Sequence, residues 1–268
     1  MITKLRQEYP LAHLLSVAQL PRATYYYHAN RLIQPDKYIQ IREQITHIFH
    51  EHQGRYGYRR ITMELRNRSY TINHKTVQRL MREAGLVCRV RMKKYRSYKG
   101  EVGKIAPNLL ERDFGTTAPN QKWVTDVTEF ALFGKKLYLS PVLDLHSQDI
   151  VGYSISERPV LSMVSNMLVR AFLQIPDDTN LILHSDQGWQ YQHQQYQRML
   201  RKKGIRQSMS RKGNCLDNAI MENFFGHLKS ELLYLQDFES MEHFVAELTD
   251  YLSYYNNRRI KAKLKGLP

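Results

Sequence analysis

The sequence KWVTDVTEFALFGKKLYLSPVLDLHSQDIVGYSIS occupies residues 122–156 and is rich in Val, Ile, Leu, Thr and Tyr. Two short polar segments, FGKK and HSQD, divide it into three parts. β-Branched and aromatic residues separated by short turns predict strands that are linked by hairpins. We therefore expect a three-stranded antiparallel meander, in which KWVTDVTEFAL forms the first strand.

Helical and extended patterns alternate after this meander. We expect a helix at 160–173, the strand LILHSD at 181–186, a helix in YQHQQYQRMLRKKG at 191–204, the short strand IRQSMS at 205–210 and a helix in DNAIMENFFGHLKSELL at 217–233. Hairpin-linked strands followed by such an alternation predict the α/β class. The fold we expect is a ribonuclease H-like mixed sheet with helices on both faces.

The patterns before residue 121 are helical. Residues 11–30 contain an apolar segment, a break at Pro21 and the segment RATYYYHAN, which predicts a helix-turn-helix-like unit. Further helices are expected at 36–53, 58–68 and 73–85, with Asn73 as N-cap and Gly85 as C-terminal cap. We therefore divide the chain into a helix-turn-helix-like segment (1–35), an all-α DNA-binding module (36–87), a basic linker (88–120) and an α/β core with C-terminal helices (121–268).

Positive charge is concentrated in the front part of this 268-residue chain. The formal net charge is +15, and residues 1–120 hold 22 basic and 9 acidic side chains (+13), against 18 and 16 (+2) in the remaining 148 residues. This distribution is typical of nucleic-acid binding. We predict contacts to DNA for basic residues on the outer helical faces and in the linker, where the alternatives are a solvated helix face and an idle linker: Arg60, Lys75, Arg79, Arg82, Arg89, Arg91, Lys93, Lys94 and Arg96.

Several classes of protein are disfavoured by composition. No apolar run approaches the ~18 residues of a membrane span, and the N-terminus lacks an apolar signal core, so we expect a cytoplasmic protein with no membrane partner. Cys88 and Cys215 are too few for a disulfide framework. His47, His50 and His52 have no matching pair at zinc-finger spacing.

Three carboxylates occur next to apolar sequence, where an ionised side chain is costly unless it is paired or binds a metal. Asp126 interrupts an apolar strand, Asp186 ends the strand LILHSD, and Glu222 flanks the apolar stripe of a helix. A buried salt bridge would explain Asp126, and so would a metal site. Hard oxygen ligands favour Mg²⁺ or Mn²⁺, and a pair of such ions catalyses phosphodiester cleavage. We predict two ions, bridged by Asp126 and each also held by one of the other two carboxylates, with Lys229 steadying a phosphate.

Other residues near these motifs receive supporting or structural roles. His184 alternates onto the same face as Asp186 but is expected to pack structurally. Asp217 is expected to cap the helix of Glu222, and Asn218 to support the site one turn before it. The two tryptophans, Trp123 and Trp189, are expected in the core rather than stacked on DNA bases.

Several of these segments together resemble a known family. WVTDVTEF, HSDQGWQY and KGNCLDNAIMENFFGHLKSEL, with 35 residues between Asp186 and Glu222, resemble the D, D(35)E signature of integrase-core transposases. The likeness is to the second-reading-frame proteins of the insertion-sequence-three family. RYGYRRIT and YNNRRIKAKLKGLP resemble that family's helical module and C-terminal segment.

This resemblance implies an integrase catalytic core in residues 121–268 and a bacterial, nucleoid-associated DNA transposase. It implies cleavage of the 3′ ends of an insertion element, their joining to target DNA, terminal inverted repeats as substrate, and a homo-oligomer on DNA. The protein made from the upstream first frame is an expected partner. Two other functions stay open: a DNA-binding regulator without catalysis, and a ribonuclease H-type nuclease, because a fold does not fix a function.

Overall fold

The computed structural model describes residues 2–33, 37–89, 105–211, 215–261, 264, 266 and 267. Within these residues a six-stranded mixed sheet forms. Strand β3 pairs with β4 on one side and with both β1 and β2 on the other, and β5 and β6 continue the sheet beyond β1. The strands are β1 (Lys122–Thr125), β2 (Thr128–Leu132), β3 (Lys135–Asp144), β4 (Ile150–Ser156), β5 (Ile182–Ser185) and β6 (Arg206–Met209). The antiparallel meander therefore continues into a parallel part, β1–β5–β6.

The expected first strand is broken at Asp126, so its prediction as one strand from 122 to 132 is wrong. Thr125 pairs with Val142 and Thr128 pairs with Leu139, so the register is kept across the gap and Asp126 falls opposite Pro141. Proline has no N–H to give to a ladder. The Asp126 carboxylate also accepts a hydrogen bond from the N–H of Val127 (2.7 Å), which draws that donor away from the sheet. Asp126 therefore lies in the break between β1 and β2.

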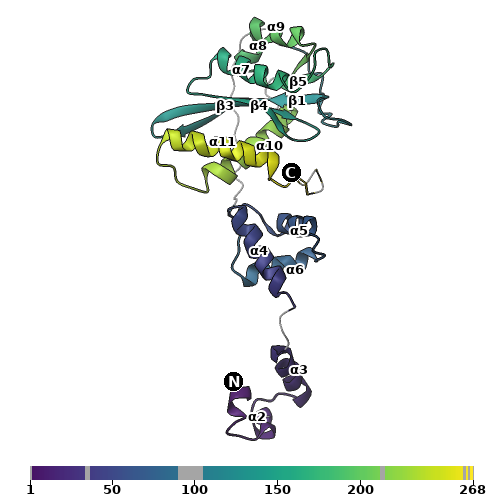
Figure 1. Ribbon diagram of the computed structural model, residues 1–268, viewed down its shortest axis with the longest axis vertical. Helices are drawn as coiled ribbons and strands as arrows, with labels where there is room; N and C mark the ends of the chain where they lie inside the picture. The colour runs from purple at the N-terminus through teal and green to yellow at the C-terminus, as the bar shows by residue number, and fades with distance from the viewer. Residues whose placement is uncertain are drawn as a thin grey trace.

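Helices cover both faces of the sheet, as the sequence predicts (Figure 1). One face carries α7 (Leu161–Phe172), α8 (Trp189–Gln192) and α9 (Gln194–Lys202), and the other carries α10 (Ala219–Leu228) and α11 (Met241–Asn257). α7 lies so close to β4 that a Cβ added to Gly152 would stand 2.8 Å from the backbone nitrogen of Ala171. The expected helix in 191–204 is split, because His193 ends α8 and caps α9.

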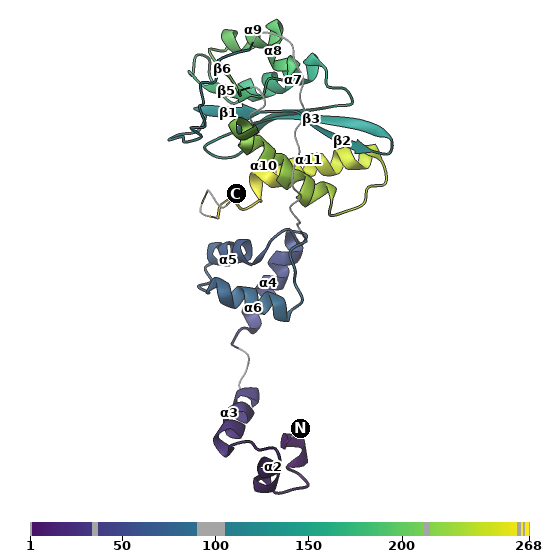
Figure 2. The same ribbon diagram turned by 180° about the vertical axis from the view of Figure 1, so that it is seen from behind.

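The helical module contains α4 (Ile39–Glu51), α5 (Tyr58–Asn67) and α6 (His74–Glu83). Its core includes Ile61 and Leu65 of α5 and Val77 of α6, all fully buried. The predicted caps are present: Asn73 accepts a hydrogen bond from the N–H of Lys75 (2.8 Å), and Gly85 has a left-handed φ of 68°. Both views show the module on the side of the sheet that α10 and α11 cover (Figure 2).

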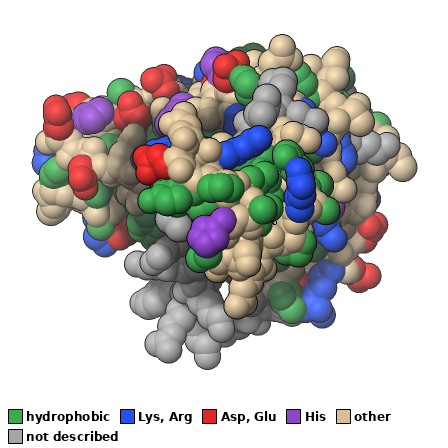
Figure 3. All heavy atoms as spheres, turned by 90° about the horizontal axis from the view of Figure 1, so that it is seen from below, with side chains coloured by type: hydrophobic (Ala, Val, Ile, Leu, Met, Phe, Trp, Pro, Cys, Tyr) green, Lys and Arg blue, Asp and Glu red, His purple; other side chains and the backbone are tan. Residues whose placement is uncertain are grey.

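Three short helices precede the module: α1 (Ile2–Leu5), α2 (Leu11–Val17) and α3 (Arg22–Ile33). The break at Pro21 separates α2 from α3, as expected for a helix-turn-helix-like unit. Figure 3 views the molecule from this end and shows Lys and Arg side chains beside hydrophobic ones in the middle of the face, with most visible acidic side chains towards its edges. In the described ranges, no helix has both the length and the apolar character that crossing a membrane requires.

Candidate active site

Two of the three predicted carboxylates meet at the carboxyl edge of the parallel strands. Asp126 follows the last residue of β1, and Asp186 follows the last residue of β5. Val124 pairs with His184 in parallel register, so each aspartate lies two residues beyond the same paired position. Burial raises the pKa of Asp126 well above its ordinary value, and repulsion from the Asp186 carboxylate raises it further.

Asp186 is held by a tight turn. Its Oδ1 accepts a hydrogen bond from the N–H of Gly188 (2.8 Å), and a Cβ added to Gly188 would stand 2.9 Å from that same oxygen. A residue other than glycine would therefore push against the carboxylate. Burial raises the pKa of Asp186, and the bond from Gly188 opposes that rise.

Glu222, the third predicted carboxylate, comes from a helix and not from a strand end. It lies in the first turn of α10 and is partly exposed, and burial raises its pKa. Glu222 also raises the pKa of Asp126, by less than Asp186 does. Across the described ranges no three His, Cys, Asp or Glu side chains are grouped as a metal-binding set. The structure thus brings Asp126 and Asp186 together and leaves Glu222 at the rim of the site.

Lys229 adds a positive charge beside the pair. It follows α10 at the start of a π-helical segment, η2 (Lys229–Leu233), and its Nζ lies 5.8 Å from the centre of the Phe130 ring. Burial lowers the pKa of Lys229, whereas attraction to Glu129 and Asp126 raises it. Lys229 is therefore close enough to Asp126 for each charge to shift the pKa of the other.

Two tyrosines beneath the aspartates were not predicted from the sequence. Tyr191 and Tyr196 are fully buried, and the hydroxyl of Tyr196 has no hydrogen-bond partner among the described residues. Burial raises the pKa of both, and the carboxylate of Asp186 contributes to each shift. The only sequence signal was the position of Tyr191 at the end of HSDQGWQY.

The residues given supporting roles lie in different surroundings. His184 is fully buried within the sheet, and its Nδ1 lies 2.8 Å from Oγ of Ser208, which agrees with a packing role. Burial lowers the pKa of His184 to about 4. Trp123 is in the core as expected, but Trp189 is 49% exposed, so its placement in the core was wrong. An exposed ring one residue after Gly188 suits contact with a partner at the site.

Asp217 does not cap the helix of Glu222, contrary to expectation. The N-cap position belongs to Asn218, whose buried side chain has no hydrogen-bond partner among the described residues. Asp217 is buried and accepts hydrogen bonds from Arg211 and from Nε of Arg112 (2.9 Å). These bonds hold the pKa of Asp217 far below its usual range. Asp217 therefore links the segment before β1 to the start of α10.

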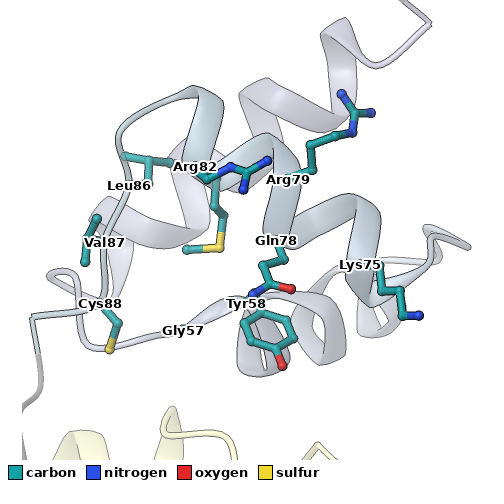
Figure 4. Close-up of a pocket in the computed structure, with 10 residues that line it drawn as sticks. Gly57, Tyr58, Lys75, Gln78, Arg79, Arg82, Leu86, Val87 and Cys88 are labelled. Atoms are coloured by element: carbon teal, nitrogen blue, oxygen red, sulfur yellow. The ribbon is translucent and has the colours of Figure 1, made fainter.

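Three predicted DNA-contact residues line one groove of the helical module. Lys75, Arg79 and Arg82 extend from α6, and the groove runs to Tyr58 of α5 with a volume of about 430 Å³ (Figure 4). All three basic side chains are exposed. One acidic side chain also lies on this face, because Nη1 of Arg79 bonds Oε1 of Glu83 (2.7 Å).

The other predicted DNA-contact residues are placed as follows. Arg60 is not on the outer face: its Nη1 bonds the buried carboxylate of Glu231 (3.1 Å). Arg89 is exposed, and its N–H donates to the carbonyl oxygen of Gly54. Outside the described residues lie Arg91, Lys93, Lys94 and Arg96.

Family models match this chain along most of its length. An HTH-like domain matches residues 37–94, and two models described as integrase core domain match residues 116–215 and 222–267. Among solved structures, the magnesium complex of the HTLV-2 integrase catalytic core domain (trimeric form) is similar at a TM-score of 0.46 and 19% identity, over 56% of this chain and 93% of that one. An integrase core behind an HTH-like domain defines a polynucleotidyl transferase that acts on DNA.

Curated relatives identify the family. The chain is 55% identical over 267 residues to the putative transposase InsK for insertion sequence element IS150 of Escherichia coli (strain K12), covering 100% of this chain and 94% of that protein. It is 34% identical over 262 residues to the transposase InsF for insertion sequence IS3A of the same organism, covering 96% and 91%. The chain belongs to the IS3 family of insertion-sequence transposases. The comparisons favour neither the regulator nor the ribonuclease H-type nuclease.

Proposed function

We propose that Asp126, Asp186 and Glu222 are the catalytic carboxylates of this transposase. In this proposal the protein cleaves the 3′ ends of an insertion element and joins them to target DNA, with Mg²⁺ or Mn²⁺ as the metal and two ions per site. The observation that carries the proposal is the pair of aspartates at the ends of adjacent parallel strands. Both have raised pKa values, and the Asp126 carboxylate is repelled by that of Asp186.

The side chains present fit a divalent cation. Asp126 and Asp186 supply hard oxygen donors whose mutual repulsion a cation would relieve. Glu222, from the first turn of α10, is partly exposed and free to reorient towards them. When bound, a pair of divalent ions activates an attacking hydroxyl and stabilises the leaving 3′ oxygen.

The chain's own residues orient the DNA around this chemistry. Lys229, whose pKa depends on the Asp126 charge, is placed to hold a phosphate oxygen next to the carboxylates. Gly188 keeps Asp186 directed into the site, because its N–H bonds the carboxylate and no side chain crowds it. Trp189 offers an exposed ring on which an unpaired base can stack.

We infer that the helical module brings the DNA to this site. Lys75, Arg79 and Arg82 form a cationic face on α6, which suits a phosphate backbone. Terminal inverted repeats and target DNA are the substrates we propose. A homo-oligomer on DNA and the upstream first-frame protein are the partners we propose, because cleavage at two ends and their joining need several active sites at one place.

The test uses purified full-length protein and plasmid DNA that carries the sequences flanking this reading frame. We expect nicking at the 3′ ends and strand joining with Mg²⁺ or Mn²⁺, and a loss of about 10³-fold or more in Asp186→Asn and Glu222→Gln. Asp250→Asn is the matched control, because Asp250 is exposed on α11. Activity that persists in either catalytic variant would refute the assignment, and calorimetric titration with Mn²⁺ would give the number of ions.

A further inference from the structure

A buried ionic cluster around Glu231 joins the helical module to the catalytic domain. Glu231 lies in the π-helical segment η2, and its carboxylate is about 1% exposed. Arg259 donates two hydrogen bonds to it, from Nε and Nη2 (both 2.7 Å), and the Tyr251 hydroxyl donates a third (2.9 Å). Arg60, from α5 of the module, donates from Nη1 (3.1 Å). Every oxygen of this carboxylate therefore has a partner.

The module also holds the backbone of the same residue. Nε of Arg55 donates to the carbonyl oxygen of Glu231 (2.9 Å), and its guanidinium lies 4.9 Å from the centre of the Tyr254 ring. A carbonyl oxygen in a π-helical turn lacks the regular α-helical partner, so an outside donor stabilises the turn. Two arginines of the DNA-binding module thus fix one residue of the catalytic domain, at both its side chain and its backbone.

The C-terminal segment strengthens this junction, because its successive residues contact the catalytic domain and the helical module in turn. Arg259 enters the Glu231 cluster, and Nζ of Lys261 bonds Oδ1 of Asp149 in the catalytic domain (2.6 Å). Ile260, between them, is buried in the hydrophobic core of the module. The N–H of Ile260 donates to the Tyr56 hydroxyl (2.8 Å). Successive residues of an extended segment point to opposite sides, so a few residues hold both parts together.

The other side of η2 faces the candidate active site. Lys229 precedes Glu231 by two residues, which is a rotation of about 200° in an α-helix, and in the wider π-helical turn the two side chains likewise leave on roughly opposite sides. The segment is wider than an α-helix, because the N–H of Tyr234 donates to the carbonyl oxygen of Lys229 five residues earlier (3.0 Å). Within η2, Lys229 therefore lies on the side of Asp126, and Glu231 lies on the side of the helical module.

We propose that Glu231 is a positioning residue, which couples the seating of DNA on the helical module to the placement of Lys229 at the active site. Arg60 links the module to Glu231, since it lies on the same helix, α5, as Tyr58 of the DNA-facing groove. A shift of α5 on DNA binding would therefore reach Glu231 through Arg60. This inference rests on the proposed active site. It gives Arg60 a role other than the DNA contact that its charge suggests.

A buried ion cluster suits this task on physical grounds. Charges removed from water contribute little net stability, and they can serve to fix one geometry over others. A purely hydrophobic junction would tolerate sliding between the two parts. A carboxylate with bidentate Arg259 and a further bond to Arg60 admits one arrangement only.

The first experiment separates positioning from DNA contact. It compares Arg60→Met with Arg59→Met, an exposed neighbour on α5 whose guanidinium contacts only the Tyr58 side chain among the described residues. The probe is a duplex copied from the DNA that flanks this reading frame, and cleavage is followed in single turnover at saturating duplex. We expect Arg60→Met to bind the duplex within about twofold of wild type and to cleave it about tenfold more slowly, a change of ~1.4 kcal/mol in the barrier.

A conservative replacement at Arg60 adds a further comparison to this experiment. Arg60→Lys keeps a charge within reach of Glu231 and should recover part of the rate, while Arg59→Met should match wild type in binding and rate. A rate in Arg60→Met that returns to wild type when more duplex is added would show that Arg60 is only a DNA contact. An unchanged rate would also overturn the proposal.

The second experiment does not depend on catalysis. Hydrogen–deuterium exchange of the amides of residues 229–234 is measured in full-length protein, with and without the same duplex, and binding is confirmed by fluorescence anisotropy. We expect duplex to slow exchange in wild type and in Arg59→Met, and to leave it unchanged in Arg60→Met. Equal responses in all three proteins would overturn the coupling. A wild type that shows this response yet never cleaves DNA would contradict the proposed function and leave the coupling standing.

Discussion

Replacing Asp126 with asparagine should raise stability and remove activity together. The Asp126 carboxylate is held where burial and the charge of Asp186 both disfavour ionisation, so its folded-state pKa lies well above the ordinary value of 3.8. An amide of the same shape keeps the packing and removes the repulsion. Relief of such strain at a functional site typically stabilises a protein by about 1–2 kcal/mol.

The pH dependence of the same variant follows from the direction of that shift. Without metal, the wild-type free energy of unfolding should fall as pH rises from about 3.8 through the raised pKa, because the unfolded chain loses its proton first. In Asp126→Asn this part of the pH dependence should be absent. The difference between the two proteins should therefore be small in acid and should grow as pH rises through the raised pKa of Asp126.

Metal should reverse the order of stability. A cation at 100 times its dissociation constant stabilises the folded protein by ~2.7 kcal/mol, which exceeds the gain expected from removing the charge. We expect Mg²⁺ to raise the unfolding temperature of wild type by about 2–4 °C for each kcal/mol and to leave Asp126→Asn nearly unchanged. Asp250→Asn, at an exposed position, is the control and should respond to Mg²⁺ as wild type does.

The assay is thermal unfolding followed by circular dichroism, with EDTA or MgCl₂, over a series of pH values. The reasoning fails if Asp126→Asn is less stable than wild type in EDTA at neutral pH. It also fails if Mg²⁺ stabilises the variant as much as the wild type. The first result would mean that the carboxylate serves the fold, and the second that the metal binds elsewhere.

Three further predictions concern the helical module and its junction. Ile260→Ala leaves a cavity in the module core and should lower the free energy of unfolding by about 2–5 kcal/mol, measured by urea denaturation, whereas Leu267→Ala, at an exposed position, should change it little. Asn73→Ala removes the N-cap of α6 and should cost about 1 kcal/mol in the same assay, and Asn73→Asp should restore most of it. His52 is buried against Tyr56 and Tyr254, and burial lowers its pKa from 6.5 to about 4, so the unfolded chain binds the proton more readily. Stability should therefore fall by up to ~3 kcal/mol as pH drops from 6.5 towards 4, and His52→Gln should flatten this fall; an equally steep fall in the variant would contradict the assignment.

Much of the fold could be predicted from local pattern. The helices of the module, the caps at Asn73 and Gly85, and the alternation of helices and strands after residue 156 agree with their sequence periodicity. Caps and amphipathic faces depend on residues three or four apart, which a sequence displays directly. The motif spacing that singled out Asp126, Asp186 and Glu222 as candidates was likewise visible in the chain.

What the sequence concealed depends on residues far apart in the chain. The first strand breaks at Asp126 partly because Pro141, on a neighbouring strand, lies opposite it. Asp217 is drawn from capping into ion pairs with Arg211, which is near in the chain, and with Arg112, by a bond that spans 105 residues. No local pattern reports such partners.

Arg60 shows the same limit for function. Its charge and helical position predicted a DNA contact, yet a carboxylate 171 residues away pairs with it inside the junction. The sequence by itself determined the chemistry available to this transposase: acidic residues at motif spacing behind a basic module. The tertiary structure alone decided which charges are exposed and which are buried, because burial and long-range pairing set the energy of a charge, and neither is a property of neighbouring residues.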